Sequence, residues 1–431
     1  MALRLETTVL LVVTMLAIAV RSDAQAPPVY LQFDPYTVKG ALYRPDAGRE
    51  RPVAVLLIHR VNNYLGHLAA RELASRGYLV LAMNSRFDNN EAAVIWEAIA
   101  QDVKLGVEYL RRERGIRKVI LFGHSGGAAT LGFYQAVAEQ GTSYCNGPQK
   151  LTVCRAELAN LPKADGVIFV DASLGNPIGL LRGLNPAVKT EGDPSGIDPA
   201  LDPFNPANGF RPGGSTYSAE FKEKYYAAQS ARMNRLIARA LEEAHRLGTP
   251  AAPFPDDNAF LIVRADGARL ADTTDSSRTA EPRKHLKNNG AIVTEVVKSS
   301  RPPAAAAPEV NASFDGGARL LTLRSFLTTN AIRSTNSMTG IDWCSSNNST
   351  PCAVGRVGVP LLVAAMGGNT GLRDNEMLFE MAASPDKDFI VVEGATHNIL
   401  PCTECETRKG EFGNATKNFF NYVAKWIGSR F

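Results

Sequence analysis

The 431-residue sequence lacks several features that would assign it quickly to a functional class. It has no Lys/Arg-rich run, and 47 basic residues against 43 acidic ones leave a net charge of only +4, so we do not expect a nucleic-acid partner. It contains no Gly-x-Gly-x-x-Gly and no Walker Gly-Lys-Ser/Thr ending, which removes the common nucleotide fingerprints. No internal repeat is present. Hydrophobic residues make up 45% of the chain, which excludes a disordered or collagen-like protein.

The amino terminus carries the only long apolar run. Residues 9–20 are apolar except for Thr14, and Arg4 precedes them. This stretch is shorter than the ~20 residues that cross a bilayer. It is typical of a secretory signal, and the small residues around Ala24 suit a signal peptidase. We therefore predict a signal peptide over residues 1–24, cleaved near Ala24, and a secreted or periplasmic mature chain without stable membrane insertion.

The six cysteines agree with export. They fall into three pairs that are close in sequence, and an oxidising compartment would make such pairs disulfides. Six cysteines allow 15 pairings, and the spacing favours the three local ones. The last pair has two competing interpretations, a zinc site and a redox-active pair, but no second ligand pair and no thioredoxin-like context surround it. The three predicted pairs are Cys145 with Cys154, Cys344 with Cys352, and Cys402 with Cys405.

The chain alternates between buried strands and helices. Apolar runs at 52–59, 78–83, 118–122 and 166–170 suit strands covered on both faces, and helical patterns separate the first three. The rhythm resumes with strands at 360–365 and 388–392 and a closing helix at 415–427. This pattern predicts an α/β fold with a mostly parallel central sheet and helices on both faces.

A long interruption divides this pattern. Residues 173–357 contain a Pro/Gly/Asp-rich stretch, a predicted helix over 218–247, strand-like runs at 259–263 and 291–297, and a predicted helix near 318–328. We therefore predict a core built from 25–172 and 358–431, with 173–357 as a cap over the site.

The most informative motif is Gly123-His124-Ser125-Gly126-Gly127. It directly follows a buried strand and opens a helix, which is the context that makes Gly-x-Ser-x-Gly meaningful. A serine on this tight turn projects its oxygen above the sheet, while the helix N-terminus directs free N–H groups at a developing oxyanion. At these residues the sequence resembles the α/β-hydrolase family, over about 52–138 and again over 359–431. The predicted cap insertion lies between these two parts and is not matched by the resemblance.

The resemblance implies a serine nucleophile, an acid and a histidine. Ser125 takes the nucleophile position. His397, the only histidine in the last third of the chain, follows the last predicted strand and takes the base position.

The acid is expected shortly after Gly367, where the chain instead has Gly368, Asn369 and Thr370. Asp374 is the nearest carboxylate and is our prediction for the acid. Glu376 and Asp171, at the end of the fourth strand, are the two alternatives.

The resemblance also places an oxyanion hole. The Gly126 N–H is one donor, and the Val61 N–H is the implied second. The family usually has a glycine after the strand histidine, whereas this chain has Arg60. We predict that Arg60 binds a carboxylate of the substrate, with an ordinary surface arginine as the alternative.

These residues predict an exported serine hydrolase that cleaves a small-molecule carboxylic ester, lactone or thioester through an acyl-enzyme. An amidase or peptidase on the same residues, or a non-catalytic binding protein with the same fold, are the alternatives. No cofactor is implied. A calcium site is not expected either, because the acids of the insertion lack EF-hand spacing. Those acids are Asp193, Asp198 and Asp202.

Overall fold

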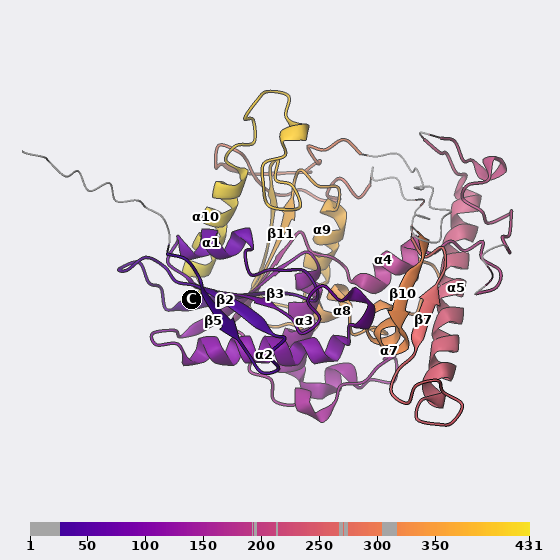
Figure 1. Ribbon diagram of the computed structural model, residues 1–431. Helices are drawn as coiled ribbons and strands as arrows, with labels where there is room; N and C mark the ends of the chain where they lie inside the picture. Colours follow the sequence, from indigo (N-terminus) through magenta and orange to yellow (C-terminus); the bar gives the residue numbers. More distant parts are fainter. Residues whose placement is uncertain are drawn as a thin grey trace, which may run out of the picture.

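The chain folds around one ten-stranded, mostly parallel sheet (Figure 1). This computed structural model describes residues 26–431 except 192, 194–195, 213, 267–269, 271–274 and 304–316. The predicted signal segment, 1–24, therefore lies outside the described residues. Within the described part, no helix has the length and apolar character needed to cross a membrane.

The order of strands in the sheet is β1-β2-β4-β3-β5-β6-β11-β12-β8-β9. The strands from β4 to β8 run parallel, while β1, β2 and β9 pair antiparallel with their neighbours at the two edges. The carboxyl ends of the parallel strands therefore lie at one edge of the sheet, where ligands of open α/β sheets usually bind. The ten strands are β1 Val29–Gln32, β2 Lys39–Tyr43, β3 Val53–His59, β4 Leu79–Asn84, β5 Lys118–His124, β6 Gly166–Val170, β8 Arg283–Leu286, β9 Ile292–Glu295, β11 Leu361–Met366 and β12 Lys387–Val392.

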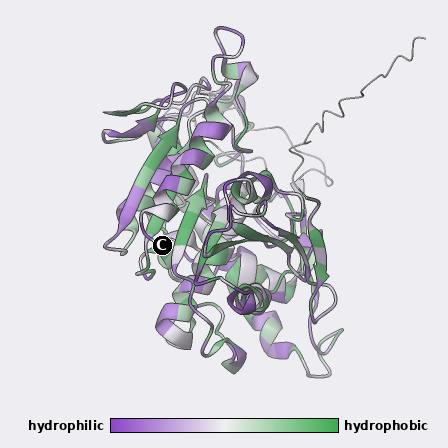
Figure 2. Ribbon diagram, turned by 90° about the vertical axis from the view of Figure 1, so that its left-hand side faces the viewer, coloured by the Kyte–Doolittle hydropathy of each residue, from purple (hydrophilic) through white to green (hydrophobic). Residues whose placement is uncertain are grey.

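Helices cover both faces of the sheet. Along β3, Leu56 and Ile58 pack into the core beneath α2, α3 and α9, while Val55 and Leu57 pack into a second core with α1 and α10. Figure 2 shows hydrophobic colour along the strands of the interior, with hydrophilic colour mainly on the outer helices and loops. The predicted fold class of helices on both faces of a parallel sheet is confirmed. The helices are α1 Leu68–Ala74, α2 Trp96–Arg112, α3 Gly126–Gln140, α4 Asn176–Gly183, α5 Ala219–Arg246, α7 Leu323–Ser325, α8 Thr350–Val354, α9 Leu372–Met381 and α10 Ala415–Gly428.

The predicted insertion is only partly separate from the sheet. Its long helix α5 and a two-stranded sheet of β7 (Ala259–Ile262) and β10 (Arg319–Thr322) lie beside the main sheet in Figure 1. In contrast, β8 and β9 from the same segment extend the main sheet beyond β12. The strand β8 reads Arg-Lys-His-Leu, so no apolar run marked it. The domain division at 172/173 and 357/358 stays a prediction, but part of 173–357 belongs to the central sheet.

The helix predicted near 318–328 is wrong in its first half. Its residues 319–322 pair antiparallel with β7 and form β10, and helical structure follows only over α7 and the π-helical turn Phe326–Asn330. The sequence Arg-Leu-Leu-Thr is compatible with a helix or with a strand, and pairing with β7 makes it a strand.

Candidate active site

The strand β5 ends in a sharp turn at Ser125. This residue has φ 55° and ψ −127°, a backbone conformation that non-glycine residues rarely adopt. The glycines on either side make the turn possible. A Cβ at Gly123 would lie 2.6 Å from the Ala128 Cα, and one at Gly127 would lie 2.6 Å from the Ile58 carbonyl oxygen. The Gly-x-Ser-x-Gly motif therefore forms the strained turn that was predicted.

The Ser125 side chain does not cap α3, although Ser125 is the residue before its first turn. Its hydroxyl is thus not used to satisfy the helix N-terminus. The backbone of Ser125 is fixed to β6 instead, because its N–H donates to the Val170 oxygen at 3.0 Å and its own oxygen accepts from the Ser173 N–H at 3.1 Å.

His397 lies in the loop between β12 and α10, and Asp171 holds its ring. The His397 Nδ1 lies 2.5 Å from Oδ2 of Asp171, whose side chain is buried. A ring whose Nδ1–H donates to a carboxylate leaves its Nε2 as an acceptor. The hydrogen bond with Asp171 raises the pKa of His397 above its ordinary value, and burial opposes this effect.

A cavity of about 160 Å³ brings these groups together. The candidate nucleophile and the candidate base come from loops that follow β5 and β12, and both line this cavity. The segments that follow β6 and β11, together with the first turn of α9, supply the remaining wall. The lining residues are Ser125, Asp171, Ala172, Ser173, Asn369, Gly371, Asp374, Asn375 and His397.

The structure corrects the predicted acid. Asp374 lines the cavity in the first turn of α9, but it makes no hydrogen bond to His397 in the described part of the chain. Glu376 is fully buried elsewhere, where its carboxylate accepts from Arg283 Nε at 2.6 Å and from the Ala280 N–H at 2.7 Å. Asp171 is therefore the carboxylate that contacts the imidazole.

Asn369, in the loop after β11, is hydrogen-bonded to the carboxylate of Asp171. Asn369 occupies the place where the family resemblance led us to expect an acid, and its Nδ2 donates to Asp171 Oδ2 at 2.5 Å. The Met366 N–H donates to the other carboxylate oxygen at 3.3 Å. Thus the carboxylate comes from the end of β6 and the loop after β11 supplies an amide that holds it.

The predicted second oxyanion donor is already engaged. The Val61 N–H donates to Nδ1 of the His59 ring at 3.2 Å, and the Asn62 N–H donates to the same nitrogen at 2.9 Å. The loop after β3 thus folds back on its own histidine, which the sequence pattern did not reveal. The Gly126 N–H, in contrast, belongs to the free first turn of α3.

Arg60 is likewise engaged within the protein. Its Nε and Nη2 donate to Oε1 of Glu91 at 3.1 and 3.0 Å, and Asn176 donates to the same oxygen at 2.6 Å. Its Nη1 lies beside Gly126, where an added Cβ would approach it to 2.4 Å. The guanidinium is thus paired with an internal carboxylate, and its binding of a substrate carboxylate stays a prediction.

A chain of histidines that sequence analysis did not single out holds the His397 backbone. His124 Nε2 lies 2.7 Å from the His397 carbonyl oxygen, and His124 Nδ1 lies 3.0 Å from His67 Nε2. The Ala69 N–H donates to His67 Nδ1, so each ring can donate to the next acceptor in turn. Burial lowers the pKa of His124 to about 3 and that of His67 to about 4, which keeps both rings neutral. Tyr64 adds a hydrogen bond to the His124 carbonyl at 2.9 Å.

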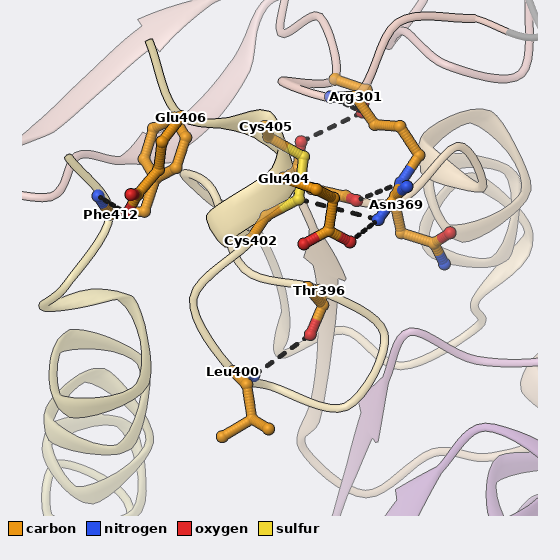
Figure 3. Close-up of a disulfide and its surroundings, with 12 residues drawn as sticks. Arg301, Asn369, Thr396, Leu400, Cys402, Glu404, Cys405, Glu406 and Phe412 are labelled. Atoms are coloured by element: carbon orange, nitrogen blue, oxygen red, sulfur yellow. Dashed lines mark hydrogen bonds and ion pairs between the residues drawn. A yellow bond between two sulfur atoms is a disulfide. The ribbon is translucent and has the colours of Figure 1, made fainter. Parts of the chain in front are cut away.

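The three predicted disulfides are present, and one of them lies just after the histidine loop (Figure 3). Cys402 and Cys405 are bonded, so neither a zinc site nor free thiols describe this pair. The Cys402 N–H donates to the Gly394 oxygen at 2.7 Å. Arg301 contacts Glu404 between the two cysteines and donates to the Gly368 oxygen at 3.1 Å. The loop of His397 is thus fastened at its far end.

No site for a metal ion was found among the described residues, since none of them form a group of three or more His, Cys, Asp or Glu side chains that could hold one.

No family model and no curated protein matches the sequence. Among solved structures, the siderophore hydrolase EstB from Aspergillus fumigatus is 12% identical, with 95% of this chain and 98% of that chain covered and a TM-score of 0.44. The α/β hydrolase GrgF from Penicillium sp. sh18 is 9% identical, with 94% and 99% covered and a TM-score of 0.42. Est1E from Butyrivibrio proteoclasticus is 9% identical, with 94% and 100% covered and a TM-score of 0.40. Because these TM-scores are below 0.5, the likenesses carry no argument here, and the fold class, a mostly parallel sheet with helices on both faces, rests on this chain's own strand order.

Proposed function

We propose that this protein is an exported serine hydrolase that cleaves a carboxylic ester, lactone or thioester. The observation that carries the proposal is the hydrogen bond from His397 Nδ1 to buried Asp171, beside a cavity that Ser125 also lines. An acid that orients an imidazole next to a serine on a strained turn is the arrangement that activates a hydroxyl as a nucleophile.

The reaction begins when His397 Nε2 takes the proton of the Ser125 hydroxyl and the serine oxygen attacks the acyl carbon. Asp171 fixes the tautomer and stabilises the imidazolium that forms. The imidazolium then gives its proton to the leaving alcohol as the carbon–oxygen bond breaks, which leaves an acyl-enzyme. Water, deprotonated by the same imidazole, attacks the acyl carbon and releases the acid and the serine.

The negative charge of the tetrahedral intermediate needs donors near Gly126. Its N–H at the start of α3 is one, because the helix N-terminus favours negative charge. The Val61 N–H would have to leave the His59 ring to serve as the second. The Arg60 guanidinium is the other candidate, because its Nη1 lies beside Gly126 and contacts the His59 Nε2 at 3.3 Å rather than Glu91.

Labelling with a fluorophosphonate probe tests the proposal, because the probe reacts only with an activated serine. The wild-type protein should be labelled and Ser125→Ala should not. Ser173 supplies the matched control, since it lines the same cavity but its hydroxyl accepts from the Gly175 N–H at 3.2 Å. Ser173→Ala should keep the label. An unlabelled, folded wild-type protein would support a non-catalytic binding protein instead.

A substrate panel then separates the reaction classes. Esters of p-nitrophenol with acyl chains of several lengths, together with lactones, thioesters and anilides, should show ester-type turnover that Ser125→Ala abolishes. Faster cleavage of the anilides than of the esters would identify an amidase and overturn the ester assignment.

A further inference from the structure

A second, wider cavity adjoins the one that Ser125 and His397 line. Its volume is about 610 Å³, which is within the range of small-molecule sites. The two cavities share Ala172, Ser173 and Asp374 in their walls. We call the wider one the side chamber. A substrate whose acyl carbon lies at Ser125 can therefore extend into the side chamber.

Two cations in the side chamber form no ion pair with any described acidic residue. Arg182, from α4, makes one hydrogen bond in the described part of the chain, from Nε to the Ser337 oxygen at 3.4 Å. A guanidinium has five N–H donors, so four of them have no acceptor among the described residues. Lys222, from α5, forms no ion pair with any described residue. Both side chains line the cavity.

The third cation of the side chamber is different. Arg373 is paired with Glu376 at 2.7 Å and with Glu380 at 3.1 Å. Its charge is therefore balanced within α9, and only the charges of Arg182 and Lys222 are left for a ligand.

The acids that line the side chamber form no ion pair with those two cations in the described part of the chain. Asp275 is exposed and lies 3.4 Å from Arg278. Asp374 forms no ion pair with Arg182; burial raises the pKa of this carboxyl, and the charge of Arg182 opposes that effect. The chamber also has an apolar wall that includes Leu174 and Ile178. A charge bound against such a wall is screened less than one in water.

We propose that the side chamber binds a carboxylate of the substrate through Arg182 and Lys222, so that the enzyme prefers anionic esters. This inference rests on the proposed function. The planar guanidinium matches a carboxylate in a two-point geometry, and the ammonium adds a second charge. The sequence led us to expect that Arg60 binds this carboxylate, but Arg60 forms an ion pair with Glu91. We assign carboxylate binding to Arg182 and Lys222 instead.

Two matched pairs of esters test the inference. The mono-p-nitrophenyl ester of adipic acid and p-nitrophenyl hexanoate differ only in a terminal carboxylate on the acyl side. The 4-carboxyphenyl and 4-carbamoylphenyl esters of hexanoic acid differ in charge on the alcohol side. In at least one pair, the wild-type kcat/KM should favour the anionic ester. Arg182→Gln should lower that preference about tenfold, mainly through KM, because the substrate carboxylate loses its charged hydrogen bonds to the guanidinium.

Further variants separate charge from folding. Arg182→Lys should restore part of the preference, and Lys222→Gln should lower it by about threefold, as expected for one exposed ion pair. Lys224→Gln is the matched control, because Lys224 lies on the same helix but is exposed and paired with Glu220 at 2.7 Å. It should leave the preference unchanged.

Two outcomes would overturn the inference. If Ser125-dependent cleavage shows no anionic preference in either pair, or one that Arg182→Gln leaves intact, the side chamber does not bind a carboxylate while the proposed function stands. If the folded wild-type protein cleaves none of the four esters, the proposed function fails and this inference fails with it.

Discussion

Replacing Asp171 by asparagine removes the negative charge beside His397 and nearly preserves the shape of the side chain. All three partners of this carboxylate are donors: His397 Nδ1–H, the Asn369 amide and the Met366 N–H. An asparagine offers one oxygen and one NH₂ group, so at least one of these donors must face another donor. The imidazole then loses its counter-charge and part of its orientation.

The expected loss in kcat is between about 10² and about 10⁴. The lower figure follows from one charged hydrogen bond of about 3 kcal/mol, the upper end of the usual range, at ~1.4 kcal/mol for each factor of ten in rate. The higher figure, on the order of 10⁴, is reached when the imidazole also adopts the wrong tautomer. The measurement is the kcat of Asp171→Asn on a p-nitrophenyl ester, with thermal unfolding to verify that the variant is folded.

The pH dependence gives a second readout of the same change. The bond to Asp171 raises the pKa of His397 above 6.5, and only the neutral ring accepts the serine proton. The acidic limb of kcat/KM in the wild type should therefore lie above pH 6.5. In Asp171→Asn it should move to lower pH. The raised pKa also adds stability that is complete below the unfolded pKa and disappears as the pH rises through the folded pKa, and the variant should lose this contribution.

Two variants make the experiment decisive. Asp165 stands before β6, at the opposite end from Asp171, where it pairs with Arg111 at 2.7 Å and Lys118 at 3.1 Å. Asp165→Asn should therefore affect stability slightly and leave kcat and the pH profile unchanged. Asp374→Asn tests the competing acid. If it reduces kcat more than Asp171→Asn does, the assignment of Asp171 is refuted.

Three further changes should also have measurable effects. Gly123→Ala should abolish activity and lower the melting temperature, measured by calorimetry, by several degrees, because the added Cβ would lie 2.6 Å from the Ala128 Cα. A variant with wild-type activity would contradict the strained turn. The double change of Cys402 and Cys405 to serine should reduce kcat several-fold and increase proteolysis of the histidine loop, so unchanged kcat and digestion would argue against a stiffening role. His124→Phe should reduce kcat by about tenfold, because the hydrogen bond to the His397 carbonyl is lost. The acidic limb of the pH profile of kcat/KM should not move. A shifted limb would show that His124 itself titrates in the reaction.

Several parts of the fold and site were predictable because each follows from a local pattern. The buried parallel strands are continuous apolar runs, and Ser125 stands where such a run changes directly into a helix through glycines. His397 was predictable because it follows the last strand. The local cysteine pairs followed from their short spacing.

The parts that could not be predicted depend on contacts between distant segments. Asp171 was only an alternative for the acid, because its contact with His397 spans 226 positions and depends on the sheet order, in which β6 and β12 lie on either side of β11. The bond that occupies the Val61 N–H depends on the rotamer of His59, which no spacing reveals. Strand β8 is charged, so its place in the sheet comes from pairing with β12.

The direct contact between the Ser125 backbone and β6 has a consequence for how this protein can change. Ser125 and Asp171, two of the three proposed catalytic residues, directly follow the adjacent strands β5 and β6. Both precede the region between β6 and β11 in the sequence. That region also supplies Arg182 and Lys222 of the side chamber. Its loops can therefore be lengthened, shortened or exchanged, and the choice of substrate altered, while the spacing of nucleophile and acid is inherited intact.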